Sequence, residues 1–127
     1  MYGFSRNIDA GFEEAVGRVR DALQREGFGV LTEIDVQATL KKKLDVDFRK
    51  YVILGACSPP NAYKALSAEL EIGLFLPCNV IVYERDGGGS AVAAIDASLM
   101  AAATGNDALS EVASTVNEKL KRVIATF

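Results

Sequence analysis

Residues 74–96 (LFLPCNVIVYERDGGGSAVAAID) contain the pattern that decides the fold. A long apolar run ends at Glu84, and the glycine-rich stretch at residues 86–89 separates it from a second apolar run over residues 91–96. Glycine adopts positive φ angles easily, so a stretch of this kind between two apolar runs is typical of a hairpin turn. The pattern predicts two adjacent antiparallel strands. Pro77 marks the start of the first strand, because proline cannot donate to a strand ladder.

Three further strands are predicted N-terminal to this hairpin. Residues 1–8 alternate between aromatic or aliphatic and polar side chains, and residues 28–36 show the same period of two, which is typical of a half-buried strand. The run YVILGAC at residues 51–57 is continuously apolar and too short for a helix of its own. It predicts a central strand.

Helices are predicted between these strands from apolar residues at helical spacing. One follows Asp9 and stops at Gly27, a short one is capped by Asp35, and one begins at Ser58 or Pro59 and ends before Gly73. A long C-terminal helix has an apolar stripe made of Leu109, Val112, Val116, Leu120, Val123 and Phe127.

The predicted element order is therefore β-α-β-(short α)-β-α-β-β-α. Each long helix has one apolar stripe and can cover one face of a sheet. The economical architecture is a single α+β domain over residues 1–127, with a mixed or antiparallel sheet and helices packed mainly on one face.

The charge, the apolar stretches and the cysteine count of the chain argue against several classes of protein. The formal charge is −3, and the one basic cluster, Lys41–Lys43, is interpreted as a solvated helix face, so no nucleic-acid partner is expected. No secretory signal is expected at the start, and no apolar stretch reaches the ~20 residues of a membrane span. Two cysteines do not form a disulfide framework, so a cytoplasmic location without membrane association is expected.

The chain contains no histidine. This excludes Ser-His and Cys-His nucleophile pairs, HExxH sites and zinc fingers. The sequence therefore assigns no catalytic residue, no metal site and no cofactor, and it leaves open whether the protein is an enzyme.

The candidate site lies where two cysteine motifs would converge. Cys57 ends one predicted strand immediately before a helix, and Cys78 begins the next strand. If these strands are antiparallel neighbours, both thiols lie at one end of the sheet. Ser58 and Asn79, which follow the two cysteines, are then available as polar contacts. The main hypothesis is a module that binds a small ligand or a partner at this end.

Other interpretations remain open. The helix N-terminus would favour the thiolate form of Cys57, so Cys57 and Cys78 could form a redox pair or hold a soft metal. Both could instead be small buried residues, in a structural dimer that binds no ligand. Glu33 and Asp35 lie on one strand face as a possible acid–base or hard-metal pair, or as a solvated face in which Asp35 caps a helix.

Three motifs together resemble one known family. EGFGVLTEIDV (residues 26–36), YVILGACSPP (residues 51–60) and IGLFLPCNVIVYE (residues 72–84) are similar to the prokaryotic family called domain of unknown function 302. That family usually has asparagine where this chain has Ser58, and either residue can cap a helix.

The resemblance implies an α+β fold likened to one half of the TATA-binding protein, and it implies a homodimer. The apolar strands of a small sheet also favour a homodimer, because an unpaired edge strand can pair with a second chain. The resemblance implies no reaction.

Overall fold

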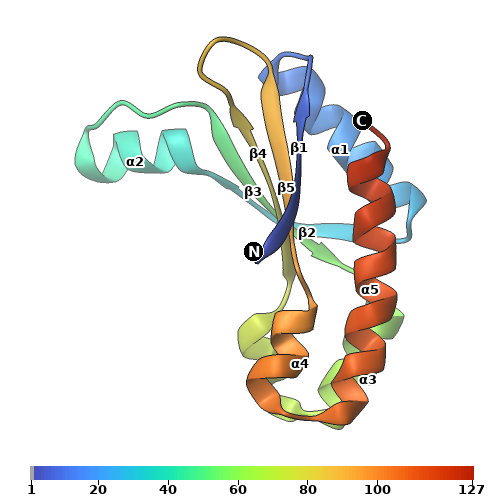
Figure 1. Ribbon diagram of the computed structural model, residues 1–127. Coiled ribbons are helices and arrows are strands. Elements are labelled where there is room, and N and C mark those ends of the chain that lie inside the picture. Colours follow the sequence, from blue (N-terminus) through green and yellow to red (C-terminus); the bar gives the residue numbers. More distant parts are fainter. Residues whose placement is uncertain (1) are drawn as a thin grey trace.

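The computed structural model describes residues 2–127, so Met1, included in the predicted first strand, lies outside the described residues. Five strands form one sheet in the order β1-β5-β4-β3-β2, and every neighbouring pair is antiparallel (Figure 1). The predicted hairpin is confirmed as β4 and β5, and the sheet is antiparallel throughout. The strands are β1 (Gly3–Ile8), β2 (Gly29–Asp35), β3 (Tyr51–Cys57), β4 (Cys78–Glu84) and β5 (Ser90–Ile95).

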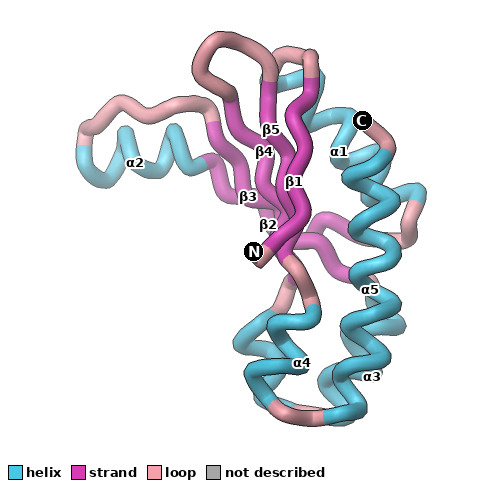
Figure 2. Tube along the Cα trace, in the orientation of Figure 1, coloured by secondary structure: helices cyan, strands magenta, loops and turns pink. Residues whose placement is uncertain are grey.

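The helices are distributed unevenly around this sheet (Figure 2). The two longest, α1 (Phe12–Arg25) and α5 (Asp107–Ala125), lie side by side on one face and confirm that helices pack mainly on one side. Two more, α3 (Pro59–Ala68) and α4 (Ser98–Thr104), gather beyond one end of the strands. The short α2 (Val36–Leu44) projects away from the side opposite to α1 and α5. None of the helices among the described residues is both long and apolar enough to cross a bilayer.

Two helical elements differ from the predicted order. The helix expected to end just before Gly73 ends at Ala68, because Glu69 adopts an extended conformation and a separate 3-10 helix, η1 (Leu70–Phe75), follows. In η1 Leu70 is exposed and Ile72 is buried. The additional helix α4 has seven residues, too few to show a helical period in the sequence.

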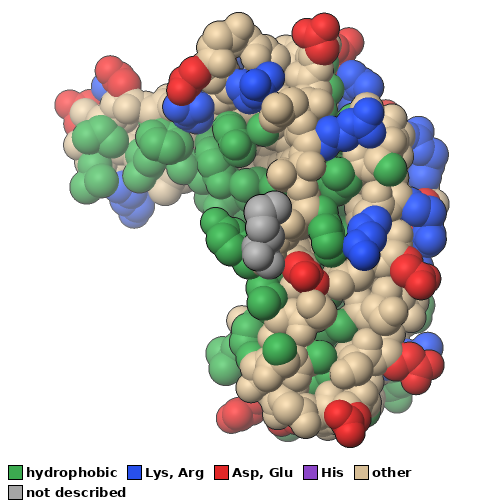
Figure 3. Space-filling view, viewed as in Figure 1, with side chains coloured by type: hydrophobic (Ala, Val, Ile, Leu, Met, Phe, Trp, Pro, Cys, Tyr) green, Lys and Arg blue, Asp and Glu red, His purple; other side chains and the backbone are tan. Residues whose placement is uncertain are grey.

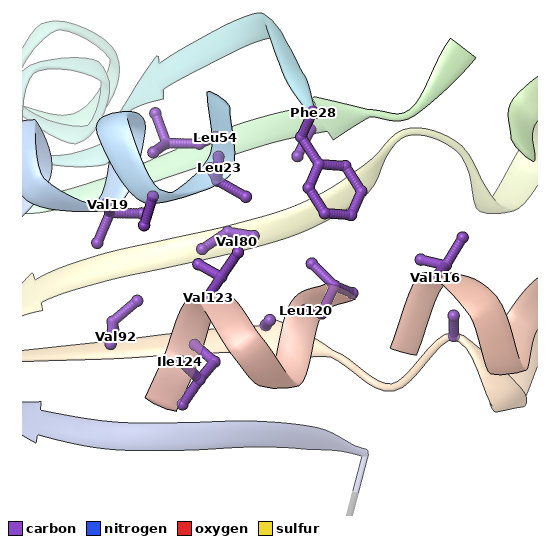
Figure 4. Close-up of a cluster of buried hydrophobic side chains, with 14 of the residues drawn as sticks. Val19, Leu23, Phe28, Leu54, Val80, Val92, Val116, Leu120, Val123 and Ile124 are labelled. Atoms are coloured by element: carbon purple, nitrogen blue, oxygen red, sulfur yellow. The ribbon is translucent and has the colours of Figure 1, made fainter. Parts of the chain in front are cut away.

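The hydrophobic core lies between the sheet and the α1–α5 layer (Figure 4). Leu120 and Val123 of α5 are fully buried there against the inward side chains of the sheet, which include Leu54 and Val80. The predicted stripe of the C-terminal helix is confirmed from Leu109 to Val123, and only Phe127, beyond the helix end, is partly exposed.

Strand alternation gives the sheet two different faces. Cys78, Val80 and Val82 of β4 share a face with the core, whereas Asn79 and Ile81 point to the face opposite α1 and α5. We call this second face the open face. Every paired strand residue can be assigned to one face or the other from this register.

Candidate functional site: an apolar cavity at the cysteine end of the sheet

The end of β3 and the start of β4 lie next to each other at one end of the sheet. The two strands are antiparallel neighbours, and Ala56 pairs directly with Cys78. The condition under which the two cysteine motifs would converge is therefore met. An open cavity of about 270 Å³ lies at this end of the sheet, between the strand ends and helices α3, α4 and α5.

The walls of the cavity are almost entirely apolar. Phe28 lies just before β2, Leu76 just before β4, and Met100 and Val116 lie on α4 and α5. No charged side chain is found among the described lining residues. Segments that are far apart in sequence thus build one hydrophobic recess, and among its described lining residues only Ser58 and Asn61 have amide or hydroxyl side chains.

Ser58 and Asn61 form a buried polar pair in this apolar wall. The Asn61 Nδ2 group donates a hydrogen bond of 2.9 Å to Ser58 Oγ, and both residues are buried. Ser58 occupies the N-cap position of α3 as predicted, but its hydroxyl caps no backbone N–H group. Pro60, at the second helical position, has no N–H to donate, and Ser58 Oγ accepts from the Asn61 side chain instead of from the Asn61 backbone N–H.

The two cysteines are free and partly buried, and both line the cavity. Burial, and after it the nearby Cys57, raises the pKa of the Cys78 thiol to about 11. Cys78 is therefore a neutral thiol at physiological pH. Cys78 pairs with Ala56, so the two share a face of the sheet. Cys57 is the next residue after Ala56, and strand alternation directs its side chain to the opposite face, which is unfavourable for a disulfide.

The structure brings together three of the four predicted site residues, namely Cys57, Ser58 and Cys78. Asn79 is exposed on the open face opposite Gly55 and does not line the cavity. Asn61 was not predicted, although its position three residues after Ser58 places the two on neighbouring turns of one helix.

The acidic pair on β2 has separate partners. Glu33 forms an ion pair with Arg20 at 2.8 Å, and Asp35 accepts a hydrogen bond from the Ala38 N–H at 2.9 Å. The predicted capping role of Asp35 is confirmed. Across residues 2–127, no group of three or more His, Cys, Asp or Glu side chains is arranged to hold a metal ion.

Comparison with known proteins agrees with this architecture. The crystal structure of an uncharacterized conserved DUF302 protein from Bacillus stearothermophilus has a TM-score of 0.90 and 29% sequence identity to this chain. The alignment covers 98% of this chain and 97% of the other. No functionally curated protein matches the sequence. The model of the family described as "Domain of unknown function DUF302" matches residues 4–127, and the chain belongs to that family.

Proposed function

We propose that the protein binds a small, mainly apolar molecule in the cavity at the cysteine end of the sheet. The observation that supports this is a hydrophobic recess with one buried polar pair, Ser58 and Asn61, in its wall. Sites for small molecules are typically concave and mainly apolar, and a few polar groups orient the ligand. The volume of about 270 Å³ is close to the lower end of the range for such sites, roughly 300 Å³.

The lining also indicates the chemistry of the ligand. Because no charge lies among the described lining residues, burying an ionised group here would be costly. Ser58 Oγ accepts from Asn61, and no hydrogen bond donated by this hydroxyl is found within the described chain. A hydroxyl has one proton to donate, so the best ligand is a neutral molecule with an apolar body and one acceptor, such as a carbonyl or ether oxygen.

The proposal is tested by titration with Nile red, a neutral apolar dye whose fluorescence rises in hydrophobic sites. Ala62→Phe would fill the cavity from α3, and Ala68→Phe, on an exposed position of the same helix outside the cavity, is the matched control. We expect saturable binding to the wild type and the control, and at least a tenfold weaker affinity for Ala62→Phe. Equal affinity in all three proteins would contradict the proposal.

Ser58→Ala tests the polar part of the assignment. It should weaken binding of neutral ketones more than binding of hydrocarbons of the same length, because only the ketone loses a hydrogen bond. The two ligand series can be compared by displacement of the dye. An equal loss for both series would show that Ser58 does not orient the ligand.

A thiol-dependent function is the second candidate, because both free cysteines line the same cavity. Free thiols also suit the reducing cytoplasm, which we propose as the compartment. The test is alkylation of the native protein, compared for Cys57→Ser and Cys78→Ser. Labelling at Cys57 near neutral pH would support a nucleophile or sensor, and protection by zinc or copper(I) would support a soft-metal site. Labelling of neither thiol before unfolding would leave both as core residues.

A further inference from the structure

The open face of the sheet is unusually apolar for a surface with no cover. Among the described residues no helix lies over it, and an antiparallel sheet with one free face normally alternates to polar side chains there. Instead Ile34, Ile53 and Ile81 form a row across three strands. Beside this row Tyr51 stacks on Tyr83, with ring centroids 5.4 Å apart. The face has the composition of an interface.

A second feature, the arm, projects from the same side of the molecule. We define the arm as residues 36–50, that is α2 and the segment leading into β3 (Figure 1). None of the nine residues of α2 is buried. Leu44 is 66% exposed and Phe48 is 43% exposed. An isolated helix of this length is marginal in water, and α2 contacts its own chain chiefly at β2 and β3, so its exposed apolar side chains need another surface to pack against.

The apolar surface continues beyond the arm and the sheet. Figure 3 shows hydrophobic side chains along one concave side, over the arm, over the sheet and at the end that contains α3 and α4. At that end Leu70 and Leu74 of η1 are more than four-fifths exposed, and Leu99 of α4 is 40% exposed. Contiguous exposed apolar surface of this extent marks an interaction site.

The total exposed area of the chain is larger than that of a typical compact monomer. A compact monomer of this mass exposes about 6,600 Å², whereas this chain exposes 7395 Å². The excess, roughly 800 Å², equals the area that one partner buries in an interface of standard size. The projecting arm and the uncovered sheet face account for this excess, which is large enough for one side of such an interface.

We propose that a second copy of this chain covers the concave face, in a two-fold dimer in which the arm of each copy lies on the open face of the other. A second copy fits because one contact, repeated by symmetry, gives each arm an apolar surface and each sheet a cover. The two copies contact each other through the face opposite α1 and α5. It is independent of the cavity proposed to bind a ligand, since dimer formation can be measured without any ligand.

The first test is the mass in solution by light scattering at micromolar concentration. The wild type should have twice the chain mass of 13.6 kDa. Leu44→Lys should reduce this to the single-chain mass, because it places a charge in the interface while leaving the folded chain undisturbed at an exposed position. A cation also suits the C-terminal end of α2. The control Thr115→Lys, on an exposed position of α5, should keep the double mass.

The second test probes the sheet side and the arm directly. Ile81→Lys changes the open face, and circular dichroism verifies that this variant is folded. Hydrogen exchange of residues 36–44 should be at least tenfold faster in Leu44→Lys than in the wild type, because the partner protects these amides. A wild type of single-chain mass would overturn the proposal. So would a dimer that survives both Leu44→Lys and a folded Ile81→Lys.

Discussion

Truncation of Leu120 tests the central packing of this fold. Leu120 lies on α5, is fully buried, and packs close to Phe28 and Val80 between the helix layer and the sheet (Figure 4). The substitution Leu120→Ala removes three carbon atoms without introducing a polar group. We expect a clear loss in the free energy of unfolding and an unchanged fold.

The size of the loss follows from two contributions. At about 0.8 kcal/mol for each buried carbon, the lost transfer free energy is about 2.4 kcal/mol. If the neighbours do not move, roughly 80 Å³ of empty space adds about 2 kcal/mol at ~24 cal/mol per Å³. Val116, one turn earlier, lines the open cavity, so part of the new space can relax towards it. The expected loss is therefore about 2.4 to 4 kcal/mol.

The assay is equilibrium unfolding in urea, followed by far-ultraviolet circular dichroism at fixed protein concentration. Glu118→Ala is the matched control, since it truncates an exposed side chain of the same helix and should change stability by less than about 0.5 kcal/mol. A loss below about 1 kcal/mol for Leu120→Ala would refute the assignment of this face to the core. Fixed concentration matters because a dimer contributes to the apparent stability.

Two further predictions use the same unfolding assay. Gly55→Ala should lower the free energy of unfolding by about 1–3 kcal/mol. The reason is that a Cβ atom at Gly55 would lie 2.7 Å from Pro77 Cγ and would also meet the Thr32 hydroxyl. Unchanged stability would show that these neighbours move aside freely. Since burial raises the pKa of Cys78 from 9.0 to about 11, the unfolded chain loses this proton first. The wild type should therefore hold its full advantage over Cys78→Ala below pH 9 and lose it progressively between pH 9 and about 11. A difference that does not vary with pH would contradict the burial of this thiol.

Local patterns were sufficient to predict most of the fold. The α5 stripe repeats over a long helix, so its buried face follows from spacing alone. Gly87, Gly88 and Gly89 all adopt positive φ angles, which is why their run marks the β4–β5 turn so clearly. The convergence of Cys57 and Cys78 required one more condition, that β3 and β4 pair in antiparallel, and the sheet order satisfies it.

The site residues were harder to predict because they depend on which way a side chain points. Asn79 was grouped with Cys78 as its neighbour in sequence, yet alternation along a strand sends adjacent side chains to opposite faces. Asn61 was missed because its role depends on its side chain, and not its backbone N–H, donating to the Ser58 hydroxyl. The helix of the arm was predicted as a short helix capped by Asp35, but its lack of intrachain cover is a tertiary property that no local pattern contains.

The stacked tyrosines have a practical consequence for spectroscopy. The chain has no tryptophan, so its near-ultraviolet absorption and intrinsic emission come chiefly from four tyrosines. Tyr51 and Tyr83 stack on one another, and partial burial, followed by Tyr83 and Tyr2, raises the pKa of Tyr51. Alkaline difference spectra of the unlabelled protein would therefore report on this patch of the surface through the late ionisation of Tyr51. Any molecule that covers the patch becomes visible as a delayed ionisation of phenols, without a dye, a tag or an engineered fluorophore.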